Sequence, residues 1–387
     1  MTQSLSTAEL DVVRARVAAL GRTPDATDIA DALRWAGHVV SDENVLTTQE
    51  ILRSDSVGAG VLDPLLREPG VTDVLVNGAD QVFVDRGAGL VPVPVRFASE
   101  EAVRRLATRL AALVGRRLDD GSPYVDARLP DGTRVHAVLG TLAAPGTCLS
   151  LRVPARRRFS LDDWTDLGSV TPRGRDLLRA LIRRRVAFLV SGGTGSGKTT
   201  LLASLLGLVP ATERLLVVED SRELNPNHPH LVRLEARPAN AEGAGAVTLT
   251  DLVRQALRMR PDRIVLGEVR GAEICDLLLA LNTGHEGGCA TVHANSARDV
   301  PARLEALAAL GGLPRDAAHA QLAAALQVVV HVTRSAAGRR RVAEIHTMGR
   351  GDSLHVSTTA AWSLNDDGTE SLGAGWPTLA RLLGVAS

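Results

Sequence analysis

The chain of 387 residues is long enough for two or three domains, each with its own core. It carries 44 basic and 44 acidic residues, so no global field draws it to nucleic acid or anionic lipid. No apolar run reaches the roughly 18 uncharged residues of a membrane span, and the first residues lack the pattern of a signal peptide. Three scattered cysteines do not form a disulfide framework, so the composition predicts a cytoplasmic protein.

Residues 1–65 are predicted to form an N-terminal helical segment. Ser6 and Glu9 match a capping box that opens a helix running to about Leu20. Further helices are expected at 28–40, 47–52 and 62–70.

Residues 66–154 are predicted to form a small α+β domain. Asn77-Gly78 and Asp131-Gly132 each interrupt alternating apolar residues, which is typical of a hairpin turn. Ser99 is the expected N-cap of the helix between the two hairpins, and 147–154 is the last expected strand.

Residues 155–175 are interpreted as a linker with a lead-in helix, and residues 176–387 as an α/β domain. Apolar strands end in VSG, VVED and LGE, and helical sequence separates them. Alternation of strands and helices predicts a parallel sheet with ligands at the carboxyl ends of its strands.

SGGTGSGKTT at 191–200 is a P-loop pattern, with a strand expected before it and a helix after it. Its glycines let consecutive backbone N–H groups curl around an anion at a helix N-terminus. Lys198 is the only lysine in the chain, and a compact ammonium fits inside that nest where a planar guanidinium does not. The expected nucleotide-binding residues are Gly192, Gly193, Thr194, Gly195, Ser196, Gly197, Lys198, Thr199 and Thr200.

Acidic residues end two of the later strands. Glu268 closes RIVLGE at a Walker-B-like position, and Thr199 and Glu268 are the expected Mg²⁺ residues. RLLVVED supplies Glu219 and Asp220 on a strand lying between the P-loop and Glu268. In P-loop ATPases, one acid holds the Mg²⁺ shell and another polarises the attacking water.

Adenine is the expected base of the nucleotide. Guanine recognition in P-loop GTPases usually needs an Asn-Lys-x-Asp element, which a chain with one lysine at position 198 cannot contain. The contacts to adenine are expected to be apolar, and the residues that make them are not identifiable from the pattern.

TGHEGGCATVHANS at 283–296 carries His285 and His293. These histidines, with Glu286 and Cys289, are plausible zinc ligands, but their spacing matches neither HExxH nor a paired-cysteine pattern. Structural histidines and a sensor of the γ-phosphate are the alternatives, and no zinc is expected.

In order along the chain, SGGTGSGKTT, VVEDSREL, LVRQALRMRPDRIVLGEVRG and NTGHEGGCATVHANSARD closely resemble the type II/type IV secretion ATPases. The likeness is greatest to the tight-adherence pilus (TadA/CpaF-like) branch and covers roughly residues 57–350. It implies a RecA-like P-loop ATPase domain after a smaller α+β (PAS-like) domain. The tetracysteine zinc module of some type II members is absent.

The resemblance also implies a function and a set of roles. Family members are homo-hexamers that hydrolyse ATP with Mg²⁺, act with an inner-membrane platform protein, and drive pilus assembly or secretion. Lys198 and Thr199 would bind phosphate and Mg²⁺, Glu219 would activate water, and Glu268 would be the Walker-B acid. His285 and His293 would form the histidine box.

Arginines of the front domain are expected to meet the phosphates, because the P-loop region has no obvious arginine of its own for the γ-phosphate. Arg128, Arg134 and Arg152 are candidates, and Arg134 and Arg152 are favoured. Each could instead be a solvated arginine at a strand edge.

Two other functions are weighed against a secretion or pilus motor. A nucleic-acid-translocating RecA-like ATPase is disfavoured by an aromatic content of 2% and by zero net charge. The basic clusters 156–158, 183–185 and 339–341 keep this alternative open. The third is a nucleotide-gated scaffold with little turnover.

Overall fold

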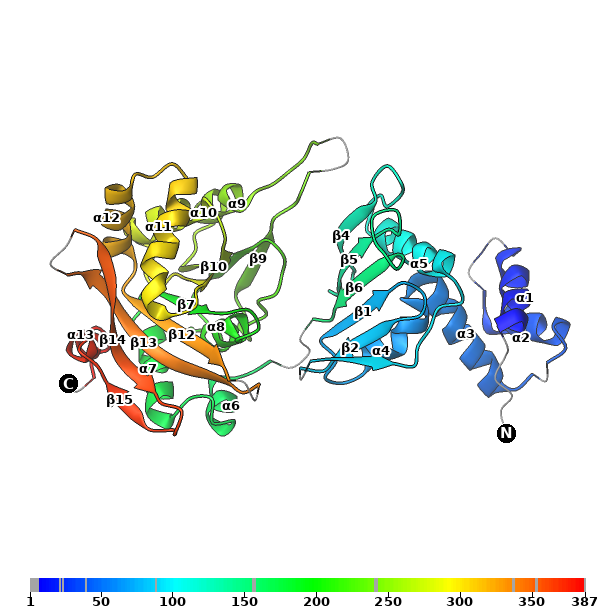
Figure 1. Cartoon of the computed structure of the whole chain (residues 1–387), viewed down its shortest axis with the longest axis horizontal. Coiled ribbons are helices and arrows are strands. Elements are labelled where there is room, and N and C mark those ends of the chain that lie inside the picture. The colour runs from blue at the N-terminus through cyan, green and yellow to red at the C-terminus, as the bar shows by residue number, and fades with distance from the viewer. Residues whose placement is uncertain are drawn as a thin grey trace. The chain divides into compact units, whose positions relative to one another are not determined.

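The computed structural model describes residues 7–20, 22, 24–38, 40–87, 89–154, 158–239, 243–335, 338–351 and 354–385 (Figure 1). The chain divides into two compact units, 1–155 and 156–387. This division lies beside the end of the predicted front domain. No helix in the described ranges combines the length and apolar character that crossing a membrane requires.

Three helices open the front unit: α1 (Thr7–Ala18), α2 (Ala26–Trp35) and α3 (Asp42–Val57). Asp25 caps α2 and forms a reciprocal capping box with Asp28. The three helices bury a small cluster that includes Val13, Ile29 and Leu33. The predicted capping residue Ser6 lies outside the described residues. The short helices η1 (Gly60–Leu62) and α4 (Asp63–Arg67) follow α3.

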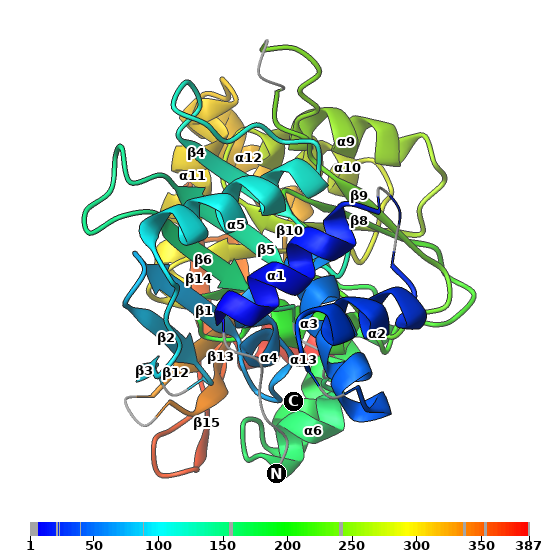
Figure 2. The same cartoon turned by 90° about the vertical axis from the view of Figure 1, so that its right-hand side faces the viewer.

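A sheet and one helix form the rest of the front unit. The strands are β1 (Asp73–Asn77), β2 (Val82–Asp85), β3 (Leu90–Val93), β4 (Tyr124–Arg128), β5 (Arg134–Val138) and β6 (Cys148–Arg152). They lie in the order β3-β2-β1-β6-β5-β4, and every neighbouring pair is antiparallel. Helix α5 (Glu100–Leu113) lies across one face of this sheet (Figure 2).

Alternation of side chains explains why α5 covers only one face. Residues such as Val74, Val135 and Leu151 point into the core that α5 shares, while their chain neighbours remain half-buried or exposed. Both predicted hairpins form, and Gly78 and Gly132 adopt φ values of 71° and 91° in their loops. The opposite face of the sheet therefore carries polar and charged side chains.

The second unit is built on a mixed sheet. Its strands are β7 (Phe188–Gly192), β8 (Leu215–Glu219), β9 (Leu231–Glu235), β10 (Arg263–Val269), β11 (Cys289–His293), β12 (Val328–Arg334), β13 (Arg340–Arg350), β14 (Val356–Leu364) and β15 (Glu370–Leu372). The helices are α6 (Leu161–Asp166), α7 (Pro172–Arg183), α8 (Lys198–Leu206), α9 (Leu249–Leu257), α10 (Glu273–Asn282), η2 (Ala297–Asp299), α11 (Val300–Leu310), α12 (Arg315–Ala325) and α13 (Trp376–Leu383).

Nine strands of the described chain lie in the order β15-β14-β13-β12-β7-β11-β10-β8-β9. From β12 to β9 all neighbours are parallel, as the alternating pattern predicted. Strands β13 to β15 extend the sheet in antiparallel fashion. Helices α6–α8 and α13 supply one buried cluster and α9–α12 the other, which gives three layers.

The segment interpreted as a linker is largely folded into the second unit. Leu161 and Trp164 of α6 are 1% and 4% exposed and join its core, and Trp164 Nε1 donates a hydrogen bond to Ser204 Oγ at 3.1 Å. Apolar side chains in this arginine-rich stretch therefore anchor it beside α8.

Candidate nucleotide site

The P-loop follows β7, a strand whose five residues are all buried. Gly192, Gly195 and Gly197 have φ values of 154°, 70° and 99°, in the region that side chains disfavour. A Cβ on Gly192 would lie 2.3 Å from the carbonyl oxygen of Val332 in the adjacent strand. Glycine is required there by close packing as well as by the turn.

Lys198 begins α8 and is 7% exposed. Its Nζ donates hydrogen bonds to the carbonyl oxygens of Gly192 at 3.0 Å and Gly193 at 2.9 Å. Both ring nitrogens of His293 lie 3.4 Å from Nζ. Burial lowers the pKa of the Lys198 ammonium, because a charge is costly away from water.

Glu268 lies at the end of β10, where the pairing of β10 with β11 shifts in register between Leu266 and Val269. Such an irregularity re-aims a side chain next to the strand end. Arg270 Nε donates to Glu268 Oε2 at 2.8 Å, and His293 Nε2 lies 2.7 Å from Oε1. Burial and then the Lys198 charge lower the pKa of His293, which favours the neutral imidazole.

Glu219 ends β8 and is 3% exposed. Its Oε1 accepts hydrogen bonds from the backbone N–H groups of Glu223 at 3.0 Å and Leu224 at 2.8 Å. A Cβ on Gly267 would lie 2.5 Å from Glu219 Cγ, so this glycine makes room for the acid. Burial raises the pKa of Glu219 to about 7 despite those two hydrogen bonds. The neighbouring Asp220 is exposed.

The sheet order corrects one expectation about these acids. The strand of Glu219 was expected between the P-loop and Glu268, but β10 is two strands from β7 and β8 lies beyond it. Glu268 is therefore the acid nearer to Lys198. Strand order depends on the packing of helices on both faces, which the chain order does not reveal.

Two buried oxygens of this edge, Ser196 Oγ and Glu219 Oε2, make no hydrogen bond within the described residues. A buried acceptor without a partner costs about 1–3 kcal/mol. Hydroxyl and carboxylate oxygens are the ligands that hard divalent cations and their bound waters prefer. Thr199 and Thr200 stand half-buried on the first turn of α8 beside them.

The two histidines of 283–296 do not lie together. His293 ends β11, in register with Gly192, whereas His285 precedes β11 and its Nδ1 lies 3.1 Å from the carbonyl oxygen of Ala280. The structure thus places His285 at the opposite edge of the sheet from the P-loop. A zinc site shared by these two histidines within one chain is excluded by this separation.

The candidate arginines of the front unit form one cross-strand row. Arg128 pairs with Arg134, and Arg134 pairs with Arg152, across β4, β5 and β6. Arg134 Nε donates to Asp126 Oδ1 at 3.1 Å, and Arg152 Nε donates to Asp73 Oδ1 at 3.0 Å. Cross-strand partners share a face, so the row belongs to the face that α5 leaves uncovered.

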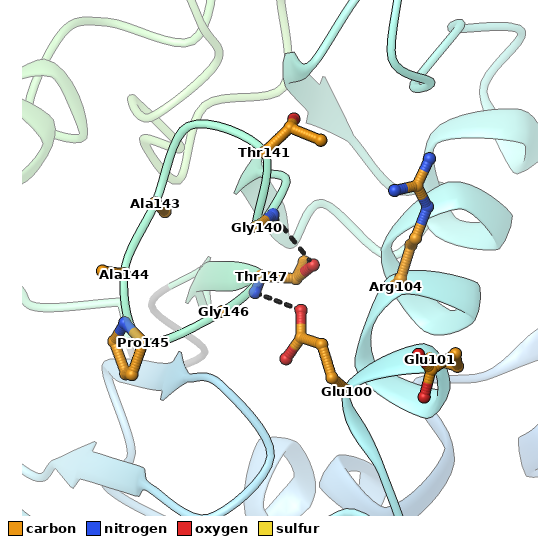
Figure 3. A pocket seen from close by; sticks show the side chains of 10 residues that line it. All are labelled: Glu100, Glu101, Arg104, Gly140, Thr141, Ala143, Ala144, Pro145, Gly146 and Thr147. Atoms are coloured by element: carbon orange, nitrogen blue, oxygen red, sulfur yellow. Dashed lines mark hydrogen bonds between the residues drawn. The ribbon is translucent and has the colours of Figure 1, made fainter.

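The front unit also has a small hollow at the start of α5 (Figure 3). Glu100 points into it, and its Oε1 accepts a hydrogen bond from the backbone N–H of Thr147. Arg104 lies on the same side of the helix. None of the predicted site residues lines this hollow, so it is separate from the arginine row.

Sequence reasoning missed Arg270. It lies on the P-loop unit and contacts Glu268, although no arginine of that unit was expected near the γ-phosphate position. Its place two residues after the Walker-B-like acid was the available signal. The sequence also gave no indication that Arg340 contacts the P-loop through the Gly195 carbonyl oxygen.

Comparisons with known proteins assign the chain to a family. A family model described as "Type II/IV secretion system protein" matches residues 55–369. A Mycobacterium tuberculosis H37Rv relative described as a "putative conjugal transfer protein" is 54% identical over 330 residues, 84% of this chain and 94% of the relative. The type IV secretion system protein PtlH of Bordetella pertussis is 35% identical over 315 residues, 73% of this chain and 92% of PtlH.

Among solved structures, the Legionella pneumophila ATPase DotB is similar in fold. It matches with a TM-score of 0.52 and 18% identity, covering 75% of this chain and 80% of DotB. At this identity the likeness concerns the fold alone.

Replacing Glu219 by Gln should change how stability depends on pH. In the unfolded chain this carboxyl has its usual pKa of 4.5, and in the folded chain about 7. Between these values only the unfolded state ionises, so the folded protein loses up to about 3 kcal/mol as pH rises, and the loss is complete above about 7. Glu219→Gln avoids this loss.

Urea unfolding between pH 4.5 and 8 measures the effect. The stability of Glu219→Gln relative to the unmodified protein should rise with pH up to about 7 and then stay level. Glu223→Gln, at an exposed carboxylate of the same loop, is the matched control. A Glu219→Gln difference that is constant over this range would contradict the raised pKa.

Proposed function

The chain belongs to the type II/IV secretion system family and is an ATPase, and we propose that it is a hexameric motor turning over Mg·ATP to power pilus assembly or protein secretion. The predicted resemblance to the type II/type IV secretion ATPases and the α/β fold are confirmed, and the tight-adherence branch stays a prediction. The proposed place of action is the cytoplasmic face of the inner membrane, reached through a platform protein.

The observation that carries the proposal is the meeting of Lys198, Glu268 and His293 beside the P-loop, with Glu219 on the same edge. A cation inside a nest of backbone N–H groups binds phosphate, and carboxylates next to it suit a metal and a nucleophilic water. If the Gly-rich loop had only a structural role, it would not need a buried lysine, a histidine and two carboxylates at the same edge of the sheet.

A magnesium nucleotide fits the residues present. Ser196 Oγ is a buried oxygen without a hydrogen-bond partner in the described chain, and Glu268 supplies a carboxylate at the same edge of the sheet. Thr199 and Glu268 would hold Mg²⁺, which neutralises phosphate charge. Lys198 would exchange its two carbonyl bonds for phosphate oxygens, and the gained charge pairing would restore its pKa.

Glu219 is the proposed base that orients and deprotonates the attacking water. A pKa of about 7 is close to the ideal for a general base at neutral pH. Its Oε1 is fixed by two backbone N–H groups, so its Oε2 is the atom left to accept a proton. Asp220 is the alternative base, but it is exposed and therefore less able to gain from desolvation.

The arginine row of the front unit is proposed to meet the phosphates when subunits assemble. Three arginines lie side by side on the open face, where a phosphate could take the place of the aspartates that pair with Arg134 and Arg152. Arginine supplied by another domain or subunit stabilises the charge of phosphoryl transfer in many NTPases. We propose Arg134 and Arg152 for this role, and His285 as a residue that acts outside its own subunit's P-loop.

The cargo is proposed to be a pilin of a tight-adherence pilus, with conjugal transfer of nucleic acid as the alternative. One relative's description favours the alternative. Three arginines of the basic clusters have partners within the chain instead: Arg184 bonds the Leu383 carbonyl, Arg185 pairs with Glu213, and Arg341 bonds the Asn365 carbonyl. ATPase rates with and without single-stranded DNA separate the two functions.

The lone lysine offers a direct test of the nucleotide site. An amine-directed reagent should label Lys198 and the N-terminus only, since the chain has no other lysine. Mg·ATP should protect Lys198 while the N-terminal amine serves as the internal control. Equal labelling of Lys198 with and without Mg·ATP, measured by mass spectrometry, would refute the assignment.

The steady-state kinetics of two variants should distinguish the roles of Glu219 and Glu268. Glu219→Gln should still bind ATP but hydrolyse it roughly 10²-fold more slowly or worse, because the base is lost and the phosphate nest remains. In the unmodified protein turnover should decline as pH falls below about 7, where Glu219 becomes protonated. Glu268→Gln should instead raise the Mg²⁺ concentration needed for activity. Near-normal turnover of Glu219→Gln would assign the base to Asp220 or Glu268.

Replacing the favoured front arginines tests assembly of the site. Arg134→Ala or Arg152→Ala should reduce turnover by up to about 10³-fold with little change in ATP affinity, because the lost contact forms with transition-state charge. Turnover per chain should also rise with protein concentration. Arg86→Ala, which removes a surface pair with Glu68 in the same unit, is the control. If Arg134→Ala and Arg152→Ala were as active as the control, these arginines would have no part in catalysis, and the front unit would serve only to dock a partner.

A further inference from the structure

The hairpin between β12 and β13 ends beside the P-loop. Strand β12 runs parallel to β7 with Val332 in register with Gly192, so both strands finish at the same level. The turn is closed by a hydrogen bond from Ser335 N–H to the Arg339 carbonyl at 2.8 Å. Arg334 and Arg340 are cross-strand partners at the base of this turn.

Both arginines approach glycines of the P-loop. Arg340 Nε donates to the Gly195 carbonyl oxygen at 3.1 Å. A Cβ on Gly197 would lie 3.1 Å from Arg340 Cδ and 3.3 Å from the Trp164 ring, and a Cβ on Gly195 would lie 3.6 Å from Arg334 Nη1. The absence of side chains at these two positions leaves space for the guanidinium groups.

Sheet order puts the hairpin and the catalytic groups on opposite sides of the P-loop strand. Strand β7 lies between β11 and β12. His293 of β11 and Val332 of β12 are both in register with Gly192. The γ-phosphate is therefore expected on the β11 side of β7, near Lys198, Glu268 and His293. The other side of β7 carries Arg334 and Arg340.

The charge arrangement favours an anionic ligand there. Like charges directly opposite each other on a sheet are destabilising. Both side chains are exposed, so they can adjust to a ligand. The next residue, Arg341, faces the other way, where it pairs with Asp366 and bonds the Asn365 carbonyl at 3.1 Å. Within the cluster 339–341, Arg341 therefore has a structural role, whereas Arg340 contacts the P-loop.

We propose that Arg340 and Arg334 bind the nucleoside end of the nucleotide, an inference that rests on the proposed ATPase site. A guanidinium is planar and can stack on the face of a purine base. With the γ-phosphate at Lys198, the α-phosphate and base extend toward the hairpin. The base-contacting residues that the motifs did not reveal are these two arginines.

Protection of Lys198 from an amine reagent measures occupancy of the phosphate nest. The full chain is compared with Arg340→Ala, Arg334→Ala and the control Arg341→Ala, each titrated with Mg·ATP and with inorganic tripolyphosphate, which has no nucleoside. Arg340→Ala should need about 10-fold more Mg·ATP for half-protection. Its response to tripolyphosphate and that of Arg341→Ala to Mg·ATP should stay within about 2-fold of the full chain.

Equal losses for Mg·ATP and tripolyphosphate in Arg340→Ala would overturn the proposal, because Arg340 would then only brace the loop. Unchanged Mg·ATP protection would overturn it as well. Arg340→Lys supplies a second measurement that does not need tripolyphosphate: it keeps the charge but not the planar stack, so the preference for Mg·ATP over Mg·CTP should fall. A retained preference would contradict base stacking. Failure of Mg·ATP to protect the unmodified chain would instead refute the nucleotide site itself.

Discussion

Parallel alignment of β12, β7, β11, β10 and β8 is the constraint on which the site depends. Parallel strands end at one edge of a sheet, so Val332, Gly192, His293, Glu268 and Glu219 are brought to one side of the second unit. Helices on both faces keep these strands in place through two buried clusters. Glycines at the same edge, among them Gly192 and Gly267, allow the backbone and the acids to approach closely.

Burial at this edge drives the charged groups toward their neutral forms. It lowers the pKa values of Lys198 and His293 and raises that of Glu219. The shifts arise because burial removes the water that would stabilise the charged forms. A partner of opposite charge would stabilise the Lys198 ammonium, and Glu219 is able to accept a proton near neutral pH. Arg270 donates a hydrogen bond to one oxygen of Glu268 and holds that carboxylate in place.

Arginine serves three different purposes in this chain. Arg263 is 1% exposed and joins Glu213 to the Ile182 carbonyl at the far edge of the sheet, so its charge is structural. Arg270 and Arg340 contact the acid and the P-loop of the nucleotide site. Arg134 and Arg152 stand in a row on the open face of the front sheet. The single lysine is placed where a point charge is required and a planar fork would displace the loop.

The sequence by itself determined the features that depend on neighbouring residues. The P-loop spacing, the strand before it and the helix after it are local, so SGGTGSGKTT was sufficient to identify them, and the two acids were recognised because each ends an apolar run. Chain order could not show that β10 lies nearer to β7 than β8, that His285 and His293 occupy opposite ends of β11, or that residues 161–166 join the second core. Arg270 and Arg334 were not singled out, and Arg340 was noted only as part of the basic cluster 339–341. Only the tertiary structure decided these points, because they depend on strand order and on contacts between segments up to 145 residues apart.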